Sequence, residues 1–133
     1  TLGNMRPLRL SQQHRVAIRS WKAELLFGTP EVLVPAKALV GQPGITYEPC
    51  RSVTYVHLLL EDHQLILAEG GAPCETILPG VMTEQWLIEE AAAIHRAAGT
   101  APYRAALPIL TYREARCVVG TRGVIRPPAA VLF

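Results

Sequence analysis

Apolar and polar residues alternate over residues 14–20, HRVAIRS, in the period of two that is typical of a β-strand. A second short strand is predicted at residues 31–34, EVLV, between Pro30 and Pro35. Proline lacks an amide donor and confines strands to short pieces or edges. Residues 36–39 then favour a single helical turn, and residues 42–44, Gln-Pro-Gly, favour a chain reversal.

The middle of the chain, VTYVHLLLEDHQLILAEGG at residues 53–71, contains two nearly continuous apolar runs, 53–60 and 64–68. The acidic pair at 61–62 separates them, so the pattern predicts a β-hairpin with its turn at this pair. Residues 70–73, Gly-Gly-Ala-Pro, are predicted to end its second strand.

The last third of the chain predicts one α-helix at about 83–98, TEQWLIEEAAAIHRAA, with Thr83 as N-cap and Gly99 as the stop. Residues 105–119 favour short extended pieces. The apolar tail RGVIRPPAAVLF is expected to pack on the body or on a neighbouring chain. The pattern as a whole predicts one mainly-β domain over residues 1–133, with a β core at 1–80 and a helix and extension at 81–133.

Composition narrows the function classes. The chain has 133 residues, half of them apolar, which suffices for one real core. The net charge is only +2 and the basic residues are scattered, which argues against a nucleic-acid surface. No apolar run reaches the roughly 20 residues that span a bilayer. The first ten residues, TLGNMRPLRL, have neither an initiator methionine nor the apolar segment of a signal peptide, so we expect a segment of a longer chain or a processed product.

Cysteine and aspartate usage limits the chemistry further. Cys50, Cys74 and Cys117 lie far apart without a CxxC pair, so we expect free thiols and no zinc site or other cofactor. Asp62 is the only aspartate and Asn4 the only asparagine. A Ser-His-Asp triad would therefore need Asp62, and neither a phosphate-binding nor a dinucleotide-binding glycine motif is present.

Two histidines flank the predicted hairpin turn. With a two-residue turn at 61–62, His57 and His63 point to opposite faces of the ribbon and cannot bind one metal together. The simplest interpretation is a core histidine at 57 and a turn histidine at 63.

A more promising pair lies in LSQQHRV, residues 10–16, where Ser11 and His14 stand three residues apart at the entry to a strand. In an irregular strand entry the two side chains can converge. They would then bring a hydroxyl and a proton-transferring imidazole to one peptide bond. The alternative, a surface serine and an edge histidine, remains open.

The order LSQQHRV, ELLFGTPEVLVPAKALV and VTYVHLLLEDHQLILAEGGAPCETILPG resembles the Hint domain of Hedgehog and intein proteins, in its bacterial Hint-like subgroup. The later segments TEQWLIEEAAAIHRAAG and TYREARCVV look like that subgroup's C-terminal extension, so the resemblance covers about residues 1–118. It implies an all-β horseshoe of curved hairpins. It also implies an N-to-S or N-to-O acyl shift: a Cys or Ser at the domain's first residue attacks the preceding carbonyl, and a TxxH motif assists.

Carried over to this sequence, Ser11 takes the Thr place of TxxH and His14 takes its His. His63 in LEDHQL matches the histidine that assists asparagine cyclisation at the C-terminal junction of inteins. No His-Asn pair follows AEGGAPCET, which excludes intein-type C-terminal cleavage and splicing. Cleavage at one end, as in Hedgehog proteins, needs no such asparagine.

The leading hypothesis is therefore the C-terminal portion of an autoprocessing Hint-like domain, contributing Ser11 and His14. We expect its nucleophilic cysteine upstream of Thr1, so the chain alone is expected to be inactive. The expected partner is the chain's own N-terminal segment or another copy, through self-association or strand swapping. The resemblance also implies secretion as part of a larger protein. The rival hypothesis is a non-catalytic Hint-derived β-module for assembly, and a hydrolase with a complete site of its own is the third.

Overall fold

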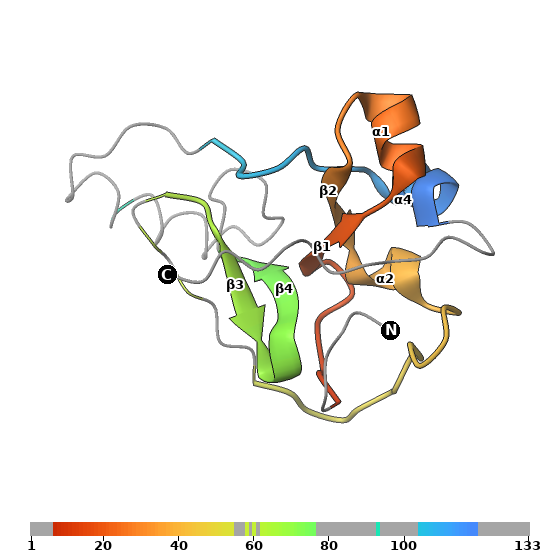
Figure 1. Ribbon diagram of the computed structural model, residues 1–133. Coiled ribbons are helices and arrows are strands. Elements are labelled where there is room, and N and C mark those ends of the chain that lie inside the picture. The colour runs from red at the N-terminus through yellow and green to blue at the C-terminus, as the bar shows by residue number, and fades with distance from the viewer. Residues whose placement is uncertain are drawn as a thin grey trace.

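A computed structural model describes residues 7–54, 58, 60, 62–76, 93 and 104–119 of the chain (Figure 1). Its centre is an antiparallel four-stranded sheet in the order β2-β1-β4-β3. The elements are β1 (Arg15–Arg19), α1 (Trp21–Phe27), β2 (Glu31–Pro35), α2 (Ala36–Leu39), β3 (Leu65–Ala68), η1 (Glu69–Gly71), β4 (Ala72–Glu75) and α4 (Tyr112–Val119). This sheet confirms the predicted mainly-β, Hint-like fold class.

The register gives the sheet two chemically different faces. Val16 of β1 pairs with Cys74 of β4, which joins the β1–β2 pair to the β3–β4 pair. Side chains alternate along each strand, so residues that pair directly point to the same face. One face is wholly apolar and forms the core with Val16, Ile18, Val32, Val34, Ala72 and Cys74. The other face carries Arg15 and Glu75, which the same register places opposite each other.

Strands β1 and β2 were predicted at residues 14–20 and 31–34, and both are confirmed, as is the helical turn α2. The helix α1 between the two strands was not predicted. Its start is capped by the Ser20 hydroxyl, which accepts a hydrogen bond from the Lys22 amide at 3.2 Å. It ends at Gly28, whose φ of 73° lies in the left-handed region that glycine adopts most easily.

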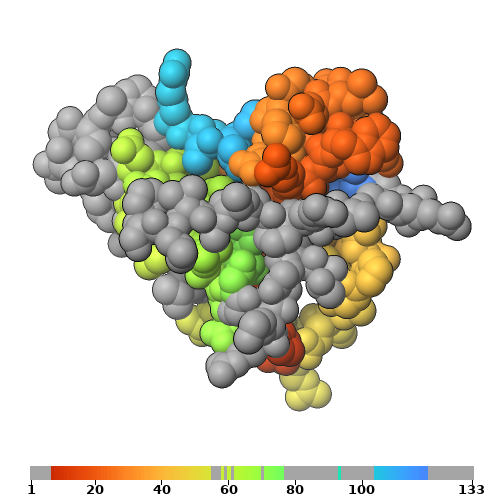
Figure 2. All heavy atoms as spheres, viewed as in Figure 1, coloured from red at the N-terminus to blue at the C-terminus, as the bar shows by residue number. Residues whose placement is uncertain are grey.

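Helix α1 is short and mostly exposed. Only Ala23 of its residues is buried, whereas Trp21 and Leu25 are 66% and 73% exposed. In Figure 2 the helix stands at the surface of the view, in orange at the upper right. Its apolar side chains therefore contribute little to the core of this chain.

The predicted hairpin of residues 53–60 with 64–68 is wrong. Residues 53, 54, 58 and 60 are not in strands, and β3 pairs instead with the following segment, β4. Gly70 and Gly71 were predicted to end the second strand of the hairpin. They instead lie in the turn between β3 and β4, where Gly71 adopts a φ of 97°. His57, and with it the prediction of its orientation, lies outside the described residues.

The prediction of extended pieces over residues 105–119 is wrong for the last eight residues, which form helix α4. Within this stretch Ile109 makes one parallel bridge to Leu33 of β2. The start of α4 is a capping box: the Thr111 hydroxyl accepts from the Glu114 amide at 3.3 Å, and the Glu114 carboxylate accepts from the Thr111 amide at 2.7 Å. This T-x-x-E signal is readable in the sequence. Of the predicted helix at 83–98 only Ala93 is among the described residues, and it is helical. The C-terminal tail lies outside the described residues.

Helix α4 and the segment before it complete the core. Leu110, Ala115, Val118 and Val119 are buried against the apolar face of the sheet. The side chain of Arg116 also donates to the carbonyl oxygen of Ala38 at the end of α2, at 3.2 Å. Residues distant in sequence from the sheet thus form part of the same hydrophobic cluster.

In the part of the chain that the structure describes, no helix has the length and apolar character needed to cross a bilayer.

We predict that Leu110→Ala lowers the free energy of unfolding by about 2–5 kcal/mol, because it leaves a cavity in the shared core. Leu25→Ala is the matched control and should change it by less than about 0.5 kcal/mol, since Leu25 is mostly in solvent. Urea denaturation followed by circular dichroism measures both. Equal effects of the two substitutions would show that Leu110 is not packed in the shared core.

Candidate functional site

Ser11 and His14 lie in a tight turn immediately before β1. The His14 amide donates to the Ser11 hydroxyl at 3.1 Å and to the Ser11 carbonyl oxygen at 3.2 Å. Two further backbone bonds fix this turn to α2: Ala36 donates to the His14 carbonyl at 2.8 Å, and Lys37 donates to the Gln12 carbonyl at 3.0 Å. The Ser11 hydroxyl therefore contacts the backbone of His14, while the predicted convergence of the hydroxyl with the imidazole stays a prediction.

Glu75, at the end of β4, is the centre of a cluster of charged and polar groups on the non-core face of the sheet. Its carboxylate accepts from the Arg15 amide at 3.2 Å and from Arg15 Nη1 at 3.1 and 3.0 Å. The Arg15 and Glu75 side chains are only 16% and 10% exposed. Partly desolvated charges of this kind stabilise a fold only when they are well paired.

His63 belongs to the same cluster and is more deeply buried than the predicted turn position would allow. Its side chain is fully buried, and its Nδ1 accepts a hydrogen bond from the Ala106 amide at 2.9 Å. Because Nδ1 accepts, the proton of the neutral ring is on Nε2. Nε2 lies 3.3 Å from Glu75 Oε2, although the alignment falls short of a good hydrogen bond, so we treat this contact as mainly electrostatic.

The charges around Glu75 determine its ionisation. Burial would raise the pKa of its carboxyl group, but His63, Arg15 and the charge of His14 together lower that pKa below the usual value of a glutamate. Glu75 is therefore an anion at neutral pH.

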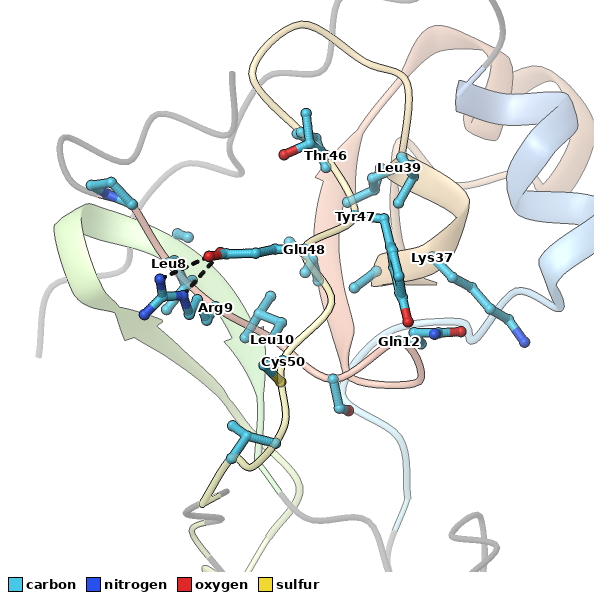
Figure 3. A pocket seen from close by; sticks show the side chains of 18 of the residues that line it. Leu8, Arg9, Leu10, Gln12, Lys37, Leu39, Thr46, Tyr47, Glu48 and Cys50 are labelled. Carbon is cyan, nitrogen blue, oxygen red and sulfur yellow. Dashed lines mark hydrogen bonds and ion pairs between the residues drawn. The ribbon is translucent and has the colours of Figure 1, made fainter.

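An open cleft of ≈ 610 Å³ lies on the other side of the Ser11 turn, between residues 7–12 and the loop at 44–53 (Figure 3). Ser11 and Cys50 both line it, whereas His14 and His63 do not. Figure 3 shows Arg9 and Glu48 reaching toward each other, and their ion pair of 3.1 Å is exposed to solvent. Ser11 thus lines the cleft from the turn that precedes β1.

The three cysteines are free thiols in different environments. Cys50 and Cys117 are exposed, whereas Cys74 is buried in the core. Burial, followed by the charge of the neighbouring Glu75, raises the pKa of Cys74 to about 11. Cys74 therefore stays protonated at neutral pH and is a poor nucleophile.

Among the described residues there is no group of three or more His, Cys, Asp or Glu side chains that could hold a metal ion.

The sequence analysis missed Arg15 and Glu75 as site residues. Arg15 appeared only as a polar position in a predicted strand, and Glu75 as part of the segment after the hairpin. Their contact joins positions 60 residues apart, and no local motif marks it. The only available signal was a single glutamate between the buried positions Cys74 and Thr76.

Comparison with known families gives one match: the sequence model of the Hint domain matches residues 1–81. The matched region contains the Ser11 turn, both strand pairs and the Glu75 cluster apart from Ala106. Searches of curated proteins and of solved structures gave no match to the chain.

We predict that Glu75→Gln lowers the free energy of unfolding at neutral pH by about 3–5 kcal/mol, because it leaves the Arg15 charge largely buried without a counter-charge. Glu48→Gln is the matched control, since it disrupts an Arg–Glu pair whose side chains are 81% and 62% exposed. Solvent screens that pair, so we expect no measurable change. Urea denaturation of both variants tests the difference.

The effect of Glu75→Gln should also depend on pH. Because the folded-state pKa of Glu75 is lowered, its carboxylate stabilises the fold fully above the unfolded-state value of about 4.3. That contribution is lost as the pH falls through the lowered folded-state pKa. The stability difference between the wild-type protein and the variant should therefore shrink on acidification below about pH 4. A difference that stays constant would contradict the charge assignment.

Proposed function

The chain belongs to the Hint domain family, and from this membership we propose that it acts in autoprocessing by an acyl shift, in which His14 handles the proton and Ser11 holds the turn that carries His14. Membership in the family supports a Hint-type role, autoprocessing or a related one. The observation that carries the finer proposal is the Ser11 turn. Ser-x-x-His fits the family's TxxH motif, and backbone hydrogen bonds fix the turn to α2, just before Arg15, whose side chain pairs with Glu75.

The proposed reaction begins with attack by a thiol or hydroxyl on the carbonyl carbon of the peptide bond before it. A C–S or C–O bond forms and the C–N bond breaks, which converts the amide into a thioester or ester. The nucleophile gives up its proton, and the leaving amine takes one. An imidazole suits this second transfer because it can both hold and release a proton at neutral pH. We assign that role to His14.

Ser11 and His63 act as supports in this proposal. The Ser11 hydroxyl accepts from the His14 amide and so holds the backbone of the turn in position. A threonine keeps the same hydroxyl, which accounts for both residue types at this place of the motif. Both ring nitrogens of the buried His63 face protein groups, Ala106 and Glu75. We therefore place His63 in the Glu75 cluster and not at the reacting atoms.

Cleavage tests this function in the natural reading frame, with any residues that it encodes before Thr1 joined to the chain. We expect two fragments by mass spectrometry once water attacks the (thio)ester carbonyl and breaks its C–S or C–O bond. Hydroxylamine should speed this second step, because a (thio)ester is far more sensitive to an added nucleophile than an amide. His14→Ala should slow the reaction by about 100-fold or more, the usual contribution of a positioned proton donor. Ser11→Thr should retain most of the rate.

His95→Ala is the matched histidine control, since position 95 lies outside the region that the family model matches. It should cleave at the wild-type rate. If the His14→Ala variant cleaves at the wild-type rate, His14 has no part in the mechanism.

A second candidate is a non-catalytic Hint-derived module for assembly or interaction. The exposed apolar side chains of α1, among them Trp21 and Leu25, favour it because they are available for contact with a partner. The same experiment separates the two functions. Absence of fragments with and without hydroxylamine, in a protein that is folded, would favour the interaction module.

A further inference from the structure

The segment that leads into α4 is held to the region matched by the family at two places. Near its end, the Leu110 amide donates to the carbonyl oxygen of Leu33 in β2 at 2.9 Å. At its beginning, the Ala106 amide donates to Nδ1 of His63 at 2.9 Å. Residues 104–106 are exposed, so little burial opposes the release of this beginning.

The contact between His63 and Ala106 depends on the protonation state of the imidazole. A neutral imidazole has one N–H group and one acceptor nitrogen, whereas a protonated ring has two N–H groups and no acceptor. Since Nδ1 is the acceptor here, a proton on it would face the N–H group of Ala106. The His63 side chain is fully buried, so water cannot separate the two donors in place. The amide must then move away from the ring.

The other side of the ring favours a positive charge. Nε2 of His63 lies 3.3 Å from Oε2 of Glu75, which pairs with Arg15 at 3.0 Å. The pKa of Glu75 is lowered, so this carboxylate is still an anion when a histidine takes up its proton. A proton on His63 therefore strengthens the contact with Glu75 and removes the contact with Ala106.

Other charged groups near the ring act weakly or indirectly. Asp62 precedes His63 in the chain, and Arg104 lies on the segment that contains Ala106. Both are exposed, so solvent screens their charges. The charge of His14 acts on Glu75 and lowers its pKa. His14 can titrate in the same pH range, and the experiment must separate the two histidines.

We infer that His63 is a pH-sensitive clasp: the neutral ring holds the beginning of the 104–110 segment, and the protonated ring releases Ala106 while staying paired with Glu75. The clasp is closed at higher pH and opens as the pH falls. The contact of Leu110 with Leu33 contains no titratable group and stays in place. The clasp exists in the folded chain without any reaction, so it does not depend on the proposed function.

Hydrogen exchange of single amides, followed by NMR in the full chain between about pH 8 and 5, tests the clasp. After correction for the intrinsic exchange rate, protection of the Ala106 amide should fall on acidification by up to about tenfold per pH unit, the limit for an opening that takes up one proton. The Leu110 amide is the internal control and should keep its protection. His14→Gln should leave the fall at Ala106 in place.

His63→Asn is the matched variant, because the asparagine carbonyl oxygen can accept from the same amide and takes up no proton. Protection of Ala106 should then be independent of pH. If this variant does not fold, the ¹⁵N resonance of His63 Nδ1 in the wild-type chain decides, since it should titrate with the midpoint at which protection is lost. Different midpoints, constant protection of Ala106 in the wild-type chain, or equal losses at Ala106 and Leu110 would overturn the inference.

Discussion

The ion pair between Arg15 and Glu75 is the interaction on which the arrangement of the sheet and site depends. The ladder between β1 and β4 contains a single registered pair, Val16 with Cys74. Just beyond it, the Glu75 carboxylate accepts from both the backbone and the side chain of Arg15. These hydrogen bonds continue the connection where the ladder ends. Because both side chains are largely buried, loss of either charge leaves the other poorly solvated.

The same pair connects the core to the candidate site. Cys74 points into the apolar core and its neighbour Glu75 to the opposite face, so one short strand serves both. The segment before α4 contributes to both the core and the polar cluster. Leu110 is buried in the core, and the Ala106 amide donates a hydrogen bond to His63. The region matched by the family therefore shares its core and its polar cluster with residues beyond 81.

The sequence was sufficient to predict the elements whose signals are local. Strands β1 and β2 follow from alternation and from Pro30 and Pro35, and these signals hold in the structure. The hairpin could not be assigned correctly, because residues 53–60, 64–68 and 72–75 are all short apolar segments and tertiary packing selects the pair. The capping box at Thr111 was readable and predicts the start of α4. The Arg15–Glu75 contact was not readable, since nothing within either segment specifies the other.

The division of roles between the histidines also depends on tertiary structure. The spacing of Ser11 and His14 identifies a motif, and the turn brings the two residues together. His63 likewise matches a family histidine, but only its burial and its contacts with Ala106 and Glu75 indicate a supporting role. We thus propose that the half-buried His14 carries the proton at the Ser11 turn, whereas the buried His63 supports the cluster around Glu75.

The most direct measurement is a double-mutant cycle of Arg15→Met and Glu75→Gln, using the free energy of unfolding at neutral pH. The account predicts that the double variant is more stable than the sum of the single effects implies, by a coupling energy of about 1–3 kcal/mol. Effects that add within about 0.5 kcal/mol would show that the two side chains do not interact, and would contradict the account.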